Sequence, residues 1–322
     1  MQIKFSRVAA AVTAAVGTLL ASVVAAPSAS AATACSGYSS ATTACVIESA
    51  SIGGTSYDVT WYLPTGTASA LMLVQHGFSR SCANQRGTSK AIAEKGVMVF
   101  CVDADMTGGN PALGATLGDT LAARALTPPS GKALPVNYVV GGHSAGGHFA
   151  SEVGAQIAAD GYGGLKGAIL FDAVASSDFT ANLQAISAGA TRPVLQIAAR
   201  PSVINLFNNS FGALADLGAG FVGIQLVWTG YLSGTPYGGS CHIDSEGENT
   251  DALGVAGALC SPSTTQTSRL RDFASAWAKD LATGTYTSSY YCADADVLTT
   301  CGTKALTVLG GTLPYAAVIP NS

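Results

Sequence analysis

Charged side chains are scarce in this sequence, and their scarcity excludes several classes of protein. Asp, Glu, Lys and Arg together make up 11% of the 322 residues, and the formal net charge is −4 at pH 7. The sequence contains no basic patch of the kind that binds nucleic acid and no charge run typical of a disordered tail. It also shows no clear internal repeat. We therefore expect a globular protein with no nucleic-acid partner.

Long apolar runs are also missing, except for one at the N-terminus. Lys4 and Arg7 precede the apolar residues 8–26, and Ala29-Ser30-Ala31 then offers a small-residue cleavage site. This order is typical of a secretory signal peptide, which is removed on export. We predict a signal peptide at 1–31, a secreted, extracellular protein, and no stable membrane insertion.

No Cys-x-x-Cys pair occurs, which argues against a structural metal site. All eight cysteines follow the predicted signal peptide, and an even number of cysteines in an exported chain predicts disulfides. Clustering along the sequence favours pairing between neighbours. The pairs that we expect are Cys35–Cys45, Cys82–Cys101, Cys241–Cys260 and Cys292–Cys301.

Strand-like and helix-like segments alternate through the rest of the chain. An antiparallel opening pair is expected at 46–51 and 57–63. The other predicted strands are 70–75, 97–102, 136–140, 168–171, 194–198 and 222–228, and the predicted helices are 83–95, 113–125, 149–158 and 267–281. This alternation predicts an α/β fold with a mostly parallel central sheet and helices on both of its faces.

We expect three parts in the chain: the signal peptide, one catalytic domain at 32–284, and a cysteine-tied extension at 285–322 packed on that domain. About twenty residues separate the strand ending at Phe171 from the strand that begins at Val194. That length exceeds a simple crossover but is too short for a large cap domain, so the cleft is expected to be open.

Gly142-His143-Ser144-Ala145-Gly146 is the motif around which the chain is organised. It follows a predicted strand and precedes a predicted helix, and it matches the G-x-S-x-G pattern of a nucleophile elbow. With 38 glycines in the chain, a chance match in a Gly-rich loop is the alternative. A phosphate-binding loop is excluded because no Lys-Ser/Thr pair follows the glycines. We therefore assign Ser144 as the candidate nucleophile.

A serine nucleophile needs a base, and this chain has only four histidines. His143 adjoins the serine, His148 lies on the following helix, and His76 ends a strand. His242 follows the last predicted strand, where an α/β hydrolase carries its histidine. We predict His242 as the general base.

An acid must orient the base, and no carboxylate follows the strand 194–198. Asp172 follows the preceding strand, whose end borders the same cleft, and we predict that it is the acid. A turn-capping role is the alternative for Asp172. Asp216 and Asp178 are the reserve candidates, and Asp244 is so close to His242 in sequence that it is expected to shape the loop instead.

Two backbone N–H groups are needed to stabilise the oxyanion that forms during acyl transfer. Ala145, directly after the nucleophile, supplies one of them. The turn His76-Gly77-Phe78 at the end of a strand supplies the other, which we assign to Phe78, with its ring as a wall of the acyl pocket. We further predict that His76, Gly77, Phe78 and His143 contribute to substrate binding.

These motifs resemble the α/β-hydrolase superfamily over roughly residues 45–283. The residues that carry the resemblance are His76-Gly77-Phe78, Gly142–Gly147, Leu170-Phe171-Asp172 and His242-Ile243-Asp244. The chain most resembles the chlorophyllase-like and dienelactone-hydrolase-like esterases and the secreted lipase/cutinase-type polyester hydrolases. The chlorophyllase-like branch also carries its acid after the strand that follows the elbow. The polyester hydrolases carry theirs one strand later, where this chain has none.

The motifs and the resemblance together predict a secreted serine ester hydrolase that needs neither a metal nor an organic cofactor. Its expected substrates are lipids, short or medium acyl esters, or polyesters, and it is expected to be a monomer. An acyltransferase with the same triad, a peptidase, and a non-catalytic binding protein on the same fold are the alternatives. The aromatic residues expected to line the cleft are Phe78, Phe179, Phe207, Phe211 and Trp228.

Overall fold

A computed structural model describes residues 32–226, 240–246, 248, 263–291 and 316–319. The predicted signal peptide therefore lies outside the described residues. So do Trp228 and three of the cysteines, Cys260, Cys292 and Cys301, so that two of the four predicted disulfides are not described.

The described strands form a single sheet with a parallel centre. Strands β5, β4, β6, β7, β8 and β9 pair in parallel, whereas β1, β2 and β3 at one end and β10 at the other pair antiparallel. The predicted α/β class is thus confirmed. In the order in which they lie across the sheet, the strands are β1 (Thr33–Ala34), β2 (Thr43–Ile52), β3 (Thr55–Pro64), β5 (Met98–Val102), β4 (Leu71–Leu73), β6 (Tyr138–His143), β7 (Leu165–Phe171), β8 (Val194–Ala198), β9 (Gly223–Leu226) and β10 (Ala316–Val318).

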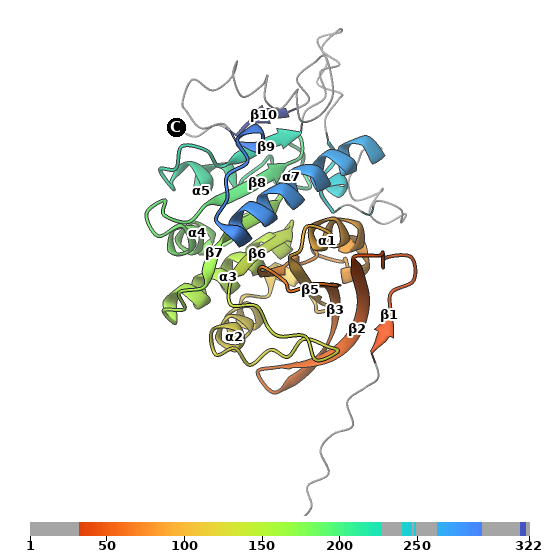
Figure 1. Cartoon of the computed structure of the whole chain (residues 1–322). Coiled ribbons are helices and arrows are strands. Elements are labelled where there is room, and N and C mark those ends of the chain that lie inside the picture. The colour runs from red at the N-terminus through yellow and green to blue at the C-terminus, as the bar shows by residue number, and fades with distance from the viewer. Residues whose placement is uncertain (1–31, 227–239, 247, 249–262, 292–315, 320–322) are drawn as a thin grey trace, which may run out of the picture. The chain divides into compact units, whose positions relative to one another are not determined.

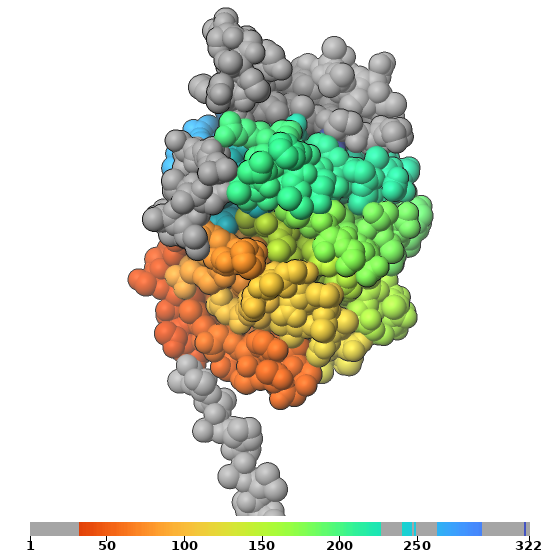
Figure 2. Space-filling view, turned by 180° about the vertical axis from the view of Figure 1, so that it is seen from behind, coloured from red at the N-terminus to blue at the C-terminus, as the bar shows by residue number. Residues whose placement is uncertain are grey.

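Helices cover both faces of this sheet. In Figure 1, α1 and α7 lie in front of the strands, and their apolar side chains share one core cluster with that face. Helices α2 to α5 pack into a second cluster on the opposite face, which Figure 2 turns toward the viewer. The helices are α1 (Arg86–Ala93), α2 (Pro111–Ala122), α3 (Ala145–Ala159), α4 (Phe179–Ser187), α5 (Phe211–Ala215) and α7 (Thr264–Thr283), and the 3₁₀ turns are η1 (Cys82–Gln85), η2 (Thr107–Gly109), η4 (His242–Ser245) and η5 (Ser288–Tyr290).

Helix α3 follows the candidate nucleophile, and its apolar spacing decides which side it buries. Phe149, Val153 and Ile157 recur every four residues and are all completely buried. Each such side chain contributes about 1.5–3 kcal/mol relative to exposure. The packing of these three side chains fixes the helix N-terminus, and therefore Ser144, against the end of β6.

Two predicted strands have different bounds in the structure: β6 is shifted toward the C-terminus, and β4 is shorter than expected. The strand predicted at 136–140 begins at Tyr138, because pairing with β4 and β7 starts there, and Val136 is 62% exposed. The strand predicted at 70–75 is regular only to Leu73. Gln75 is buried just beyond it, and both ends of its side-chain amide bond to the backbone of Val102 on β5.

Two predicted disulfides, Cys35–Cys45 and Cys82–Cys101, are present. The second joins η1 to β5, so it braces the chain that follows the His76-Gly77-Phe78 turn. Cross-links of this kind stabilise a fold mainly by restricting the unfolded chain.

Part of the predicted C-terminal extension packs on the described sheet and on α7. Strand β10 pairs with β9, and the Trp277 indole N–H donates to the carbonyl of Tyr290. The boundary at residue 284 stays a prediction. The connection from β7 to β8 contains one short helix, α4, as expected for a chain without a large cap. None of the described helices is both long and apolar enough to cross a membrane.

Candidate active site

Ser144 occupies a strained turn between β6 and α3. Its backbone has φ 56° and ψ −125°, a conformation that L side chains rarely adopt. The strand and helix approach so closely that a Cβ on Gly142 would meet the carbonyl oxygen of Gly146. A Cβ on Gly146 would likewise meet the carbonyl oxygen of His76. Only glycine fits at these two positions, and the turn leaves the Ser144 side chain half-buried at its tip.

Gly146→Ala is expected to lower the free energy of unfolding by about 1–3 kcal/mol, because the new methyl group would overlap backbone atoms that cannot easily move. Chemical unfolding of the variant measures this loss. Gly212→Ala is the matched control, since a Cβ there meets nothing within 4 Å and alanine favours the helix. Equal stability of the two variants would contradict the tight turn.

His242 and Asp172 form a buried hydrogen-bonded pair. The His242 Nδ1 atom lies 2.6 Å from Asp172 Oδ2, and both side chains are buried. Asp172 directly follows β7, and the backbone N–H of Ser144 donates to the carbonyl of Phe171, the last residue of that strand. His242 begins η4, and its ring lies 4.4 Å from the ring of His143. The candidate nucleophile, the candidate acid and the candidate base are thus brought to the carboxyl ends of β6 and β7.

Two further donors hold the Asp172 carboxylate. The backbone N–H of Ala199, the first residue after β8, donates to Oδ1 at 3.0 Å. The Asn205 amide donates to Oδ2 at 3.0 Å and to the carbonyl of Arg200 at 2.8 Å. Asn205 is completely buried, and nothing in the sequence distinguished it from the other loop asparagines. The segment that follows β8 therefore holds the Asp172 carboxylate, although that segment carries no carboxylate itself.

The reserve acids lie elsewhere. Asp216 and Asp178 are exposed at the ends of α5 and α4. Asp244 is buried, and its carboxylate accepts from the backbone N–H groups of Cys241 and Ser263. It therefore shapes the loop that carries His242, as its position in the sequence predicts.

The other predicted substrate-binding histidines are both buried. The ring of His76 hydrogen-bonds to the carbonyl of Gly77, and burial lowers its pKa. The Nε2–H of His143 donates to the carbonyl of His242 at 3.0 Å. Burial, and secondarily the nearby His242, lower the pKa of His143 well below its ordinary value. In this structure the two side chains support the turns beside Ser144 and do not face solvent.

The His76-Gly77-Phe78 turn passes directly over Ser144. A Cβ on Gly77 would lie 2.9 Å from Ser144 Cβ. Within the described residues, the backbone N–H groups of Phe78 and Ala145 have no intramolecular hydrogen-bond partner. Ala145 is the first residue of α3, where the helix dipole favours negative charge. The Phe78 ring is 58% exposed beside this site.

One group of potential metal ligands lies close to the site but does not fit a metal. Ligand atoms of His76, Cys82 and Asp103 lie within 4.8 Å of one another. The Cys82 sulfur, however, is bonded to Cys101, so it cannot act as a thiolate ligand. The Asp103 carboxylate instead accepts from the backbone N–H of Cys82.

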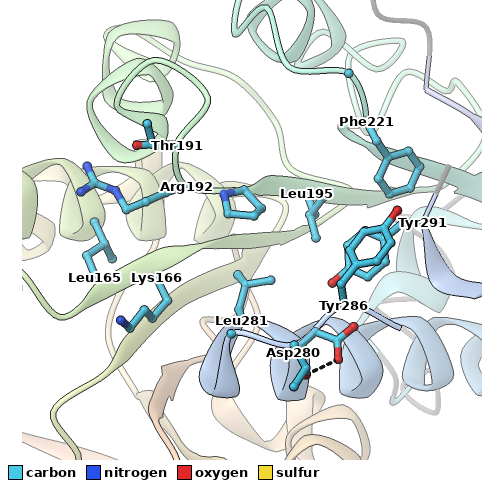
Figure 3. A pocket seen from close by; sticks show the side chains of 14 residues that line it. Leu165, Lys166, Thr191, Arg192, Leu195, Phe221, Asp280, Leu281, Tyr286 and Tyr291 are labelled. Carbon is cyan, nitrogen blue, oxygen red and sulfur yellow. Dashed lines mark hydrogen bonds between the residues drawn. The ribbon is translucent and has the colours of Figure 1, made fainter. Parts of the chain in front are cut away.

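A cavity of about 600 Å³ lies at the other edge of the sheet, where β7, β8 and β9 begin. Figure 3 shows Phe221, Tyr286 and Tyr291 on one side of it and Arg192 on the other. The Arg192 guanidinium donates to carbonyls at the end of α4, and the Asp280 carboxylate accepts from Thr285 and Thr287. This cavity thus lies at the opposite edge of the sheet from Ser144 and Asp172, which follow the carboxyl ends of β6 and β7. Ligands of such sheets bind at the carboxyl ends of the strands.

The strand order and the serine turn between a central strand and its helix define the α/β-hydrolase fold. No protein-family model and no curated protein matches this chain. An esterase from Pseudomonas putida is similar in structure, with 12% identity, 76% of this chain and 82% of that chain covered, and a TM-score of 0.48.

Two other solved structures show similarity of the same order. Carboxyl esterase 2 from Tuber melanosporum has 19% identity and a TM-score of 0.43, with 58% of this chain and 76% of that chain covered. A dienelactone hydrolase from Anabaena variabilis has 16% identity and a TM-score of 0.43, with 58% and 88% covered. Likenesses at this level do not define an activity for this chain.

Proposed function

We propose that this protein is a secreted serine ester hydrolase that cleaves carboxylic esters through Ser144, His242 and Asp172. The observation that carries the proposal is the buried His242–Asp172 hydrogen bond of 2.6 Å beside the strained Ser144 turn. A nucleophile on a tight turn, an imidazole and a carboxylate oriented toward that imidazole are the groups that acyl transfer requires.

The reaction has two stages. His242 accepts the Ser144 proton at Nε2 while the Ser144 oxygen attacks the ester carbonyl, and the Nδ1–H of His242 stays bonded to Asp172. The oxyanion accepts from the N–H groups of Phe78 and Ala145, and His242 returns the proton to the leaving alcohol. Water then attacks the acyl-enzyme by the same route, so that the acid is released and Ser144 is regenerated.

Exposed apolar side chains support an apolar ester as the substrate. Phe78 lies on the oxyanion turn, and Phe207, which is 68% exposed, follows two residues after Asn205, the residue that contacts Asp172. Val203 and Leu206 on the same loop are exposed as well. Large apolar side chains grouped near a site are typical of surfaces that bind apolar ligands. Lipids, acyl esters and polyester chains are the substrate classes with this character.

Export is part of the proposal. Lys4, Arg7 and the apolar run that follows them predict a signal peptide, and the two described disulfides are compatible with an oxidising compartment. We propose that residues 32–284 form the catalytic domain, that 285–322 pack on it as an extension, and that the protein acts as a monomer.

The test is hydrolysis of p-nitrophenyl esters from acetate to palmitate by the secreted protein, with labelling by a fluorophosphonate probe. We expect turnover on at least part of the series and one adduct, on the peptide that contains Ser144. Hydrolysis of the matching p-nitroanilide would indicate a peptidase. Transfer of the acyl group to an added alcohol, detected by product analysis, would indicate an acyltransferase. A folded protein that neither hydrolyses any of these esters nor takes up the probe would contradict the proposal.

A further inference from the structure

A buried polar chain of Arg80, Glu246 and His143 joins three segments that meet at the proposed site. Arg80 lies two residues after Phe78 on the oxyanion loop, which we define as residues 76–81. Glu246 caps η4 four residues after His242, and His143 directly precedes Ser144. The exposed fractions of the Arg80 and Glu246 side chains are only 8% and 2%. Neither Arg80 nor Glu246 takes part in the proposed reaction.

The contact between Arg80 and Glu246 is a two-pronged ion pair. Arg80 Nε donates to Glu246 Oε1 and Arg80 Nη2 donates to Oε2, both at 2.6 Å. The Glu246 carbonyl also accepts from the Thr88 hydroxyl on α1, which holds its backbone. A planar guanidinium that engages both carboxylate oxygens fixes orientation as well as distance. Because desolvation offsets much of the attraction in a buried pair, such a contact suits positioning better than stability.

His143 extends this contact to the base. Its Nε2 faces the carbonyl of His242, so the ring proton sits on Nε2 and Nδ1 is bare. That bare nitrogen lies 3.5 Å from Glu246 Oε1 without a hydrogen bond. Burial lowers the pKa of His143 well below its ordinary value, and the Arg80 guanidinium engages both oxygens of the Glu246 carboxylate. Without Arg80, the carboxylate would repel the lone pair on His143 Nδ1.

We propose that Arg80 and Glu246 are positioning residues whose ion pair holds the oxyanion loop against η4. The pair keeps the Phe78 N–H and the His242 ring in a fixed relation to Ser144. This inference rests on the proposed function, because it concerns how that site is held together. A shift of about 1 Å between reacting groups can cost about a hundredfold in rate.

The kinetic test compares Arg80→Gln, Glu246→Gln and the double variant with wild type on p-nitrophenyl esters. We expect kcat to fall about 10-fold to 100-fold while KM changes less than about threefold. The double variant is expected to be no slower than the worse single variant, since both singles break one contact. Arg80→Lys keeps the positive charge but loses the two-pronged contact, so its kcat should lie between those of wild type and Arg80→Gln.

The matched control is the pair formed by Arg271 and Glu248, which meets at 3.2 Å and is more exposed. It joins α7 to residue 248, whose carboxylate also accepts from the Tyr38 hydroxyl. Arg271→Gln and Glu248→Gln are expected to keep wild-type kcat. The double variant Arg80→Met/Glu246→Leu leaves no unpaired buried charge, so it replaces the single variants in this test if they fail to fold. Its kcat should also be lower than that of wild type.

Hydrogen exchange tests the contact without relying on catalysis. In Glu246→Gln, the backbone amides of residues 76–81 should exchange faster than in wild type. In Arg80→Gln, the backbone amides of residues 240–246 should exchange faster, because each substitution releases the segment that the other partner belongs to. Wild-type exchange in both segments, or wild-type kcat in a folded variant, would overturn the inference. If wild type shows no esterase activity but the hydrogen exchange changes as expected, the Arg80–Glu246 contact is supported and the proposed function is contradicted.

Discussion

Ser144→Ala is expected to lower kcat/KM for p-nitrophenyl esters by at least about a thousandfold, which is the scale of loss for a triad nucleophile. The hydroxyl is the only group removed, so the His242–Asp172 pair and the N–H groups of Phe78 and Ala145 remain in place. Any residual rate would come from binding and oxyanion stabilisation alone. Steady-state hydrolysis at several ester lengths measures the loss.

Ser176→Ala is the matched control. This serine is exposed just beyond β7, so its substitution is expected to leave the rate unchanged. Both variants should unfold at wild-type denaturant concentrations, since alanine in the nucleophile turn adopts the φ of 56° no less readily than serine. Activity that survives in Ser144→Ala would place the nucleophile elsewhere and end the assignment.

Asp172→Asn should cost up to about ten-thousandfold in kcat, because the amide reverses a hydrogen bond that sets the tautomer of His242. Oδ1 accepts from the N–H groups of Ala199 and Asn205, and Oδ2 accepts from His242 and Asn205. A side-chain amide that replaces this carboxylate and keeps its oxygen toward Ala199 points its NH₂ at His242 Nδ1. The imidazole proton then moves to Nε2, which can no longer accept the proton of Ser144.

The kcat of Asp172→Asn on a p-nitrophenyl ester measures this effect, with circular dichroism to verify the fold. Asp216→Asn and Asp178→Asn are the controls, and both should retain wild-type rates because these carboxylates are exposed at helix ends. Near-normal turnover in Asp172→Asn, or a large loss in Asp216→Asn, would show that a different acid orients the base.

Much of the fold was predictable because its signals are local. The apolar spacing of Phe149, Val153 and Ile157 predicts the buried face of α3, and the strand 194–198 appears with the predicted bounds. Helices α4 and α5 were not predicted: they contain nine and five residues, too few for a clear period. Strand β10 was missed for a related reason, since a three-residue strand acquires its identity only by pairing with β9.

The candidate site was predictable in part. The sequence predicts Ser144 from a five-residue motif and His242 from its place in chain order, so neither candidate depends on coordinates. Asp172 was one of several carboxylates that the sequence offered, and only the fold brings it to His242 across 70 residues. Asn205 carried no signal at all, because an asparagine in a loop does not reveal which carboxylate it will contact.

By itself, the sequence determined the class of fold and the tight serine turn, since each depends on residues close together in the chain. Only the tertiary structure decided which acid meets the base, what holds that acid, and that Arg80 meets Glu246 across 166 residues. The physical reason is that a local pattern restricts backbone conformation, whereas contacts between distant loops arise only when the sheet and its helices bring those loops to the same edge.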